Sequence, residues 1–215
     1  MQRARSAEAK QQREQAILDA ARELGAVRGI RQVTLTDIAE AVGMHKSALL
    51  RYFETREQIF LLLTADGWRD WSPSLRASLA ALTRGEEATV EAIAGVIAES
   101  LASRPMFCDL LAQAPLNLER NVSIEAVREF KLVTLEEVTL LVASFQRLRP
   151  GLTEEQAVDL IATATSLAGA LWQMATPGPQ VEALYRSDPR LSHAIVAVGP
   201  RLTRVLTATI RGFTA

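Results

Sequence analysis

The chain has 215 residues, 48% of them hydrophobic, and a formal net charge of −1 at pH 7. This is enough apolar material to bury a core that needs no disulfide or metal to stabilise it. The single cysteine, Cys108, excludes an intrachain disulfide framework and fits a reducing, cytoplasmic compartment. The charge is unevenly distributed: residues 1–60 hold ten Lys and Arg against eight Asp and Glu (+2), and residues 61–215 hold 14 against 17 (−3).

The amino-acid content predicts helix nearly throughout the chain. Gly and Pro are few, alternating runs of β-branched residues are missing, and Ala, Leu, Glu and Arg dominate. We therefore expect an all-α fold.

The polar segment 1–10 carries basic residues that no apolar stretch follows, so it does not match a secretory signal peptide. We expect it to be a short mobile arm.

Four helices are predicted in the first seventy residues. Apolar residues at three- and four-residue steps over 17–27 indicate the first helix, which Gly29 closes. Thr34 is a good N-cap for the second helix, because Asp37 is placed to reach back to it, and Gly43 ends that helix. The expected ranges are about 10–28, 34–42, 45–52 and 55 to beyond Trp68.

Six further helices are predicted beyond Pro73, at about 86–103, 106–114, 123–148, 153–175, 180–186 and 190–212. Pro200 should kink or split the last one. The uncharged stretch 160–181 is interrupted by polar residues and Pro177, so we expect a buried helix followed by a loop and no membrane span. Two capping boxes mark helix starts, Thr55 with Gln58 and Thr153 with Gln156.

The second and third predicted helices, joined at Gly43, match the helix-turn-helix pattern. The joint needs glycine because the chain must pass through positive φ after the last turn of the first of the two helices. Such corners also occur in helical bundles, so the pattern alone leaves a structural role open. The surplus of positive charge in residues 1–60 favours DNA as a partner.

The third predicted helix carries a small, cationic outward face. Leu49 and Phe53 lie one turn apart and can face the core, which leaves Lys46, Ser47, Leu50 and Arg51 on the other side. Small residues permit close approach, Arg can donate to O6 and N7 of guanine, and Lys neutralises phosphate. The alternative is that Lys46 and Arg51 only solvate a surface helix.

Three blocks of sequence resemble the tetracycline-repressor (TetR-like) DNA-binding domain in order and spacing: ILDAA at 17–21, VTLTDIAEAVG at 33–43 and KSALLRYF at 46–53. The resemblance covers about residues 13–63, and the rest of the chain matches only in helical layout and length. It implies three parts: an N-terminal arm and three-helix DNA-binding domain with the helix-turn-helix (1–54), a connecting helix (55–72), and a helical effector-binding and dimerisation domain (73–215).

The resemblance also implies roles in DNA contact. Lys46 and Tyr52 would contact the phosphate backbone, and Ser47 and Arg51 would face base edges. Thr34 would anchor a phosphate at the start of the second helix. Arg56 stands in the first turn of the fourth helix, at a position that is often basic and phosphate-binding in the family. The expected DNA-binding residues are Thr34, Thr36, His45, Lys46, Ser47, Leu50, Arg51, Tyr52 and Arg56.

Three positions depart from the common family pattern. His45 replaces a usual Ser, Ser47 replaces a usual Gly, and Leu50 replaces a usual aromatic residue. Three roles are open to His45, which could contact DNA, cap the helix or be solvated. Leu50 could touch a thymine methyl group or pack against the protein. The base preference is therefore left open.

By the same resemblance, the C-terminal helices enclose an effector, and two long helices, at about 153–175 and 190–212, pair with their copies in a homodimer. Small residues in 160–174 would permit close helix approach, although a buried core helix would look similar. Together, the aromatic and sulfur-bearing residues favour a mostly apolar ligand, although each one taken alone fits a plain core better, since such residues fill interiors anyway. The expected ligand-binding residues are Trp68, Met106, Phe107, Leu111, Asn117, Phe130, Trp172 and Gln173, with Trp71, Cys108, Gln113 and Met174 as further candidates.

The resemblance therefore implies a repressor that binds a palindromic operator and is released by a small, mostly apolar effector, with no cofactor. Effector binding would change the spacing of the two recognition helices, and the fourth helix would transmit the change. Two alternative classes of function remain. An enzyme is disfavoured because no nucleophile elbow, phosphate loop, dinucleotide motif or metal-ligand cluster is present. A helical adaptor for a protein partner would not need the basic third helix.

Overall fold

The computed structural model describes residues 2–82 and 89–213, with side chains from residue 7 onward. Every regular element in these ranges is a helix, which confirms the all-α prediction. The elements are α1 (Gln2–Arg28), η1 (Ile30–Gln32), α2 (Leu35–Ala41), α3 (Lys46–Leu49), α4 (Arg56–Leu82), α5 (Val90–Ala102), α6 (Pro105–Gln113), η2 (Leu118–Arg120), α7 (Ile124–Leu148), α8 (Glu154–Ala175), α9 (Pro179–Ser187), η3 (Pro189–Ala194) and α10 (Val198–Phe213).

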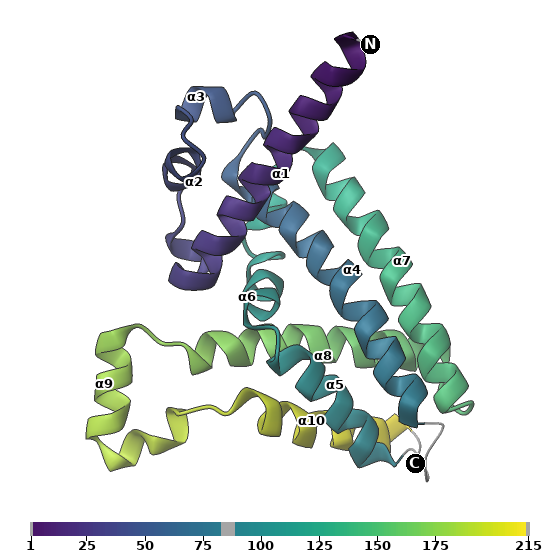
Figure 1. Cartoon of the computed structure of the whole chain (residues 1–215). Helices are drawn as coiled ribbons and strands as arrows, with labels where there is room; N and C mark the ends of the chain where they lie inside the picture. Colours follow the sequence, from purple (N-terminus) through teal and green to yellow (C-terminus); the bar gives the residue numbers. More distant parts are fainter. Residues whose placement is uncertain (1, 83–88, 214–215) are drawn as a thin grey trace.

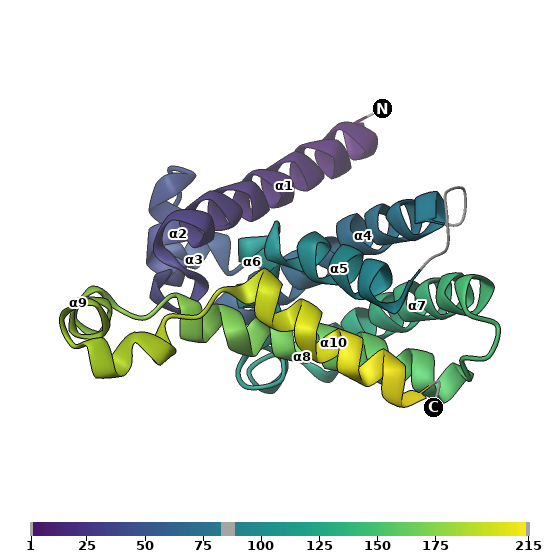
Figure 2. The same cartoon turned by 90° about the horizontal axis from the view of Figure 1, so that it is seen from below.

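The helices α1, α2 and α3 form one end of the molecule, and α4 leads from them into the larger C-terminal part (Figure 1). There α4 packs along α7, α6 lies against α8, and α10 packs against α5 and α8. The antiparallel pair α8 and α10 forms the end opposite α3, and α9 with η3 extends sideways from this pair (Figures 1 and 2). None of the described helices is long and apolar enough to cross a bilayer.

Helix α1 begins at Gln2, so the prediction of a mobile arm over residues 1–10 is wrong for the described residues 2–10. Its first turns are rich in Ala, Gln, Arg, Glu and Lys, all good helix formers, and they contain no Gly or Pro to stop a helix that propagates from the buried stripe at Ile17 and Ala21. The helix ends as expected before Gly29, which has φ 78°.

The helix-turn-helix consists of two short helices. Gly43 at the joint has φ 66°, as the pattern requires. Helix α3 is shorter than the predicted range 45–52, because it ends at Leu49 and a turn follows, with the Tyr52 amide donating to the Leu49 carbonyl at 2.9 Å. Leu49 and Phe53 are buried in the core, as the sequence predicts.

Helix α4 continues for ten residues beyond residue 72, the expected end of the connecting helix, and reaches Leu82. Pro73 lies inside it on the exposed side, where proline removes one backbone hydrogen bond without ending the helix. The Gln58 amide donates to Thr55 Oγ1 at 3.0 Å as predicted, but the Gln58 side chain accepts from the Glu54 amide instead of completing the box with Thr55. One rigid element therefore joins both parts of the chain.

The C-terminal helices fall close to their predicted ranges. Thr153 and Gln156 form the expected capping box of α8. Thr89 caps α5, and the predicted start of that helix at 86–88 lies outside the described residues. The last predicted helix is split, as expected, although the break lies at 195–197 and Pro200 falls in the first turn of α10, where its missing N–H has no helical partner to lose.

Candidate DNA-binding surface and effector site

The start of α2 is fixed by a complete capping box. Asp37 accepts hydrogen bonds from the Thr34 amide at 2.7 Å and the Thr34 hydroxyl at 2.5 Å, while the Asp37 amide donates to Thr34 Oγ1 at 3.1 Å. These bonds from Thr34, first that of the side chain, together with Arg28 at 3.1 Å, lower the pKa of Asp37 below its ordinary value. Thr34 thus fixes the start of α2. Its side chain is exposed, in the same small domain as α3.

The outward face of α3 is open to solvent. Leu50 is 45% exposed, and Thr36 on α2 is also exposed. Tyr52 is half-buried in the turn after α3. Of the predicted contact residues, Lys46, Ser47, Leu50 and Arg51 are therefore exposed around α3, and Leu49 is buried behind them.

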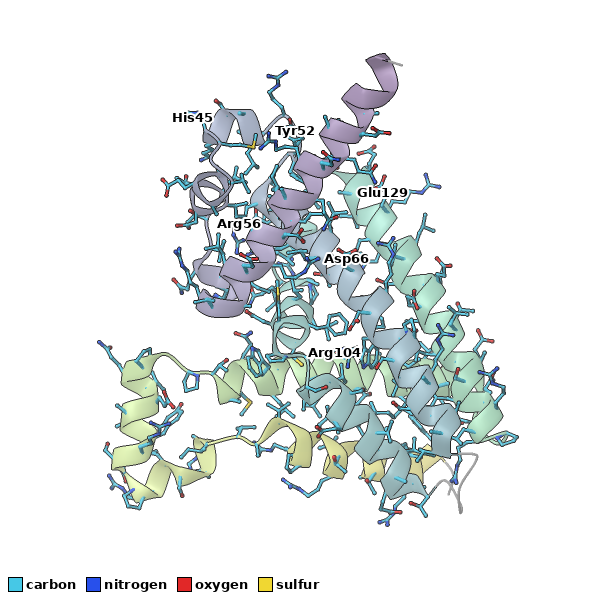
Figure 3. All side chains as sticks on the ribbon, viewed as in Figure 1. His45, Tyr52, Arg56, Asp66, Arg104 and Glu129 are labelled. Carbon is cyan, nitrogen blue, oxygen red and sulfur yellow. The ribbon has the colours of Figure 1, made fainter. Side chains whose placement is uncertain are left out.

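His45 is the N-cap of α3 (Figure 3). Its Nδ1 accepts from the Ser47 amide at 3.3 Å and lies 2.8 Å from Ser47 Oγ. Of the three roles left open by the sequence, the structure gives it the capping role, since these bonds satisfy an orphan amide of the helix N-terminus. The Ser47 hydroxyl is turned toward His45 by the same contact.

Arg56, labelled in Figure 3, turns from the start of α4 toward the segment that joins η1 to α2. Its guanidinium donates to the carbonyls of Val33 and Ile30, pairs with Glu57 at 2.9 Å and lies over the Phe60 ring. Only 14% of the side chain is exposed. All of its nitrogens are engaged within the protein, so Arg56 fastens α4 to the segment before α2.

The predicted ligand residues divide between core and clefts. Trp68, Trp71 and Phe107 form one aromatic cluster with ring centroids 5.4 to 5.9 Å apart. All three are at most 5% exposed. Gly67 allows this packing, because a Cβ there would lie 2.3 Å from the Phe107 ring. These three residues, expected from the sequence to line the effector site, thus pack against each other in the interior.

A small apolar cleft lies between α4 and α7. Leu61, Leu62, Ala65, Phe130 and Val133 line its wall, with Gln58, Arg69 and Glu129 as polar neighbours, and its volume is about 80 Å³. Figure 3 labels Glu129 on the upper part of α7, the helix that forms one side of this cleft. Of the predicted ligand residues, Phe130 alone lines this cleft.

A larger groove of about 420 Å³ lies between α1, α4 and α6 and includes Met106 and Phe107. Its rim is charged, and the charges pair with each other: Arg22 with Asp66 at 3.4 Å and Arg104 with Asp70 at 2.8 Å. Figure 3 shows Asp66 and Arg104 along this junction. The groove therefore combines an apolar floor with a rim of paired charges, at the junction of the two parts of the chain.

The other predicted ligand residues serve as structural contacts. Leu111 and Trp172 are half-buried and pack against the core. Asn117 accepts hydrogen bonds from the Asn121 amide group at 2.9 Å, through its carbonyl and its side chain. Gln173 donates to Asp109 at 2.7 Å. Within residues 2–82 and 89–213, no three His, Cys, Asp or Glu side chains gather as metal ligands.

Two residues that link the parts of the chain were not singled out from the sequence. Asp109 on α6 also accepts from the Ile30 amide at 2.9 Å. Glu54, in the turn after α3, accepts from the amide and hydroxyl of Ser123 at 2.9 and 2.8 Å, at the start of α7. An acidic residue in an otherwise apolar helix, such as Asp109 in α6, is the one signal that could have drawn attention to it.

Comparison with known families and structures agrees with this layout. The family described as "Bacterial regulatory proteins, tetR family" matches residues 17–63, and "Tetracyclin repressor-like, C-terminal domain" matches residues 65–215. No curated protein sequence matches the chain.

Solved structures share the fold at low sequence identity. Thermus thermophilus FadR, a TetR-family repressor in complex with lauroyl-CoA, has a TM-score of 0.57 and 19% identity, over 94% of this chain and 93% of its own. RolR in complex with resorcinol has a TM-score of 0.53 and 15% identity, over 94% and 96%. The fatty acid degradation regulator FadR of Bacillus halodurans has a TM-score of 0.51 and 15% identity, over 90% and 97%. Because the two family matches together span residues 17–63 and 65–215, this chain belongs to the TetR family of bacterial transcriptional regulators.

Proposed function

We propose that this protein is a homodimer that binds a palindromic DNA operator through α3 and leaves it when a small, mostly apolar effector binds between α4 and α7. The observation that carries the proposal is the solvent-exposed face of α3, where the side chains of Lys46 and Arg51 are open to solvent. Gly43 at the joint and the capping box of Thr34 at the start of α2 fix the helix-turn-helix that presents this face. Such a face matches the donors that major-groove recognition and phosphate neutralisation require.

The dimer would form through α8 and α10. Along α8, exposed residues without charge recur every four positions at Val158, Ala162, Ser166, Ala170 and Met174. Together they form one i, i+4 ridge of mostly small side chains along α8, and Val205 and Ala208 are exposed on the neighbouring α10. Small residues let helices of two copies approach closely. A twofold dimer would then present two copies of α3 to two half-sites.

The effector would have to enlarge the cleft between α4 and α7. At about 80 Å³ the cleft is well below the roughly 300–1,000 Å³ of typical ligand sites. The lauroyl-CoA and resorcinol bound by the structural relatives support a ligand with an apolar part. Because Arg56 ties the start of α4 to the carbonyls of Ile30 and Val33, a shift of α4 would pull on the segment that leads into α2.

The test is selection of bound duplexes from a random DNA library at about 0.15 M salt, where nonspecific electrostatic binding is suppressed. Enrichment of a palindrome is the expected outcome. If no sequence is enriched with or without added fatty acyl or small aromatic compounds, the protein is better described as a helical adaptor for a protein partner.

The dimer is checked by sedimentation at micromolar concentration. Wild type is compared with Ala162→Glu, which places a charge on the exposed ridge of α8, and Ala143→Glu on α7 is the matched surface control.

A further inference from the structure

Helix α1 begins well before its first contact with the core. Residues 7–16 are exposed or half-buried, and the first buried side chain of the helix is Ile17. At about 1.5 Å per residue, these ten residues extend α1 by about 15 Å beyond its packed region. Figure 1 shows it projecting at the same end of the molecule as α3. Packing against the core does not explain why residues 7–16 are helical and project here.

A groove of about 470 Å³ separates this extension from α3. Lys10 and Arg13 line it from α1, and Arg51 and Tyr52 line it from the turn after α3, with Ala48 among the smaller wall residues. Figure 3 shows Tyr52 at the position where α1 passes the helix-turn-helix. Lys10 and Arg13 lie three positions apart and therefore share one face of the helix.

The groove is strongly cationic. Three of its lining residues carry positive charge, and no Asp or Glu lines it. On α1, Lys10 pairs with Glu14 at 3.5 Å, although Glu14 does not line the groove. Neither Arg13 nor Arg51 forms an ion pair with another residue whose side chain the structure describes. Like charges held around a polar groove repel each other, and an anionic ligand would relieve that repulsion.

We infer that this groove is a second DNA contact of the protein, in which Lys10 and Arg13 of α1 and Tyr52 hold the phosphodiester backbone beside the base pairs that α3 faces. The inference rests on the proposed function, because it assumes that α3 meets a duplex. Arg51 stands at the border of the two surfaces and can reach either a base edge or a phosphate. A phosphate in the groove fits its charge, the Tyr52 hydroxyl and the small Ala48 side chain, which leaves room for the strand.

The inference is tested with the double variant Lys10→Ala, Arg13→Ala, titrated against a mixed-sequence duplex and the selected operator at several salt concentrations. We expect both affinities to fall by the same factor, because bonds to phosphate carry no sequence information. The slope of log K against log salt should decrease in magnitude by about 0.9 for each phosphate that the variant no longer neutralises. Alanine favours helix, so α1 should stay folded, which circular dichroism can check.

The control is Arg147→Ala, Arg186→Ala, which removes the same charge from exposed positions on α7 and α9. It should leave the salt slope unchanged. If the α1 variant also keeps the wild-type slope while Arg51→Ala weakens operator binding, the groove is not a phosphate site and the proposed function stands. If wild-type protein binds neither duplex at any salt concentration, the proposed function and this inference both fail.

Discussion

The carboxylate of Asp109, in the middle of α6, accepts a hydrogen bond from the backbone N–H of Ile30, which lies in the segment that leads into α2. Its other oxygen accepts a hydrogen bond from Gln173 on α8. Asp109 is 8% exposed, so both donors depend on it rather than on water. One side chain thus joins the DNA-binding part, α6 and the helix proposed to form the dimer.

Replacement of Asp109 by alanine is expected to lower the free energy of unfolding by about 1–3 kcal/mol, because it leaves the buried Ile30 amide without an acceptor. Urea denaturation measures this loss. Asp70→Ala is the control, since that carboxylate pairs with Arg104 while 72% exposed and should change stability by no more than about 0.5 kcal/mol. Equal effects of the two variants would show that the hydrogen bonds of Asp109 add no more to the free energy of unfolding than an exposed ion pair does.

Arg51 and Lys46 should differ in what they contribute to DNA binding. Arg51→Ala is expected to weaken operator binding by roughly 1–3 kcal/mol and to relax the sequence preference, as removal of a hydrogen bond to a base edge does. Lys46→Ala should weaken all sequences alike and flatten the salt dependence. Titrations of operator and mixed-sequence duplexes separate the two outcomes. Unchanged binding in both variants would remove α3 from the interface.

Gly67→Ala is expected to destabilise the protein by about 1–3 kcal/mol, since the new Cβ would lie 2.3 Å from the Phe107 ring and force it out of the aromatic cluster. The gain in helix propensity offsets at most about 1 kcal/mol of this. Gly95→Ala in α5 is the matched control, because its Cβ meets nothing within 4 Å and should stabilise by up to about 1 kcal/mol. Thermal unfolding of the two variants should shift in opposite directions.

Cys108 should be inert in the native protein. Burial, and next the charge of Asp109, raise the pKa of its thiol to about 12, so the reactive thiolate is scarcely populated at neutral pH. Its sulfur also donates to the Leu101 carbonyl at 3.2 Å. An aromatic disulfide reagent is expected to react with this single thiol only after denaturant is added. Rapid reaction in native buffer would mean that α6 opens readily.

Thr34→Ala should raise the pKa of Asp37 toward its ordinary value of 3.8, because the hydroxyl of Thr34 is the largest cause of the depression. A group with a depressed folded pKa contributes stability above its unfolded pKa and loses it as the pH falls through the folded pKa. The difference in unfolding free energy between wild type and Thr34→Ala that comes from ionised Asp37 should therefore disappear as the pH falls through the folded pKa. Carbon NMR titration of the carboxyl group measures the shift, with Arg28→Ala expected to give a smaller one.

The local rules of the sequence were sufficient for the helices and for the helix-turn-helix. Capping residues such as Thr34 and Thr153, glycines that take positive φ at 29 and 43, and apolar spacing act within a few residues, so the chain alone shows them. The same spacing identified which face of α3 is buried, because Leu49 and Phe53 are one turn apart. The helical N-terminus was missed because its polar residues lack an apolar stripe.

Only the tertiary structure decided how distant side chains are used. Trp68, Trp71 and Phe107 look alike in sequence whether they line a ligand site or fill a core, and their mutual packing decides for core. Arg56 looks like a phosphate contact until its hydrogen bonds to Ile30 and Val33 turn it inward. These roles depend on partners 23 to 39 residues away along the chain, and no local pattern records such contacts.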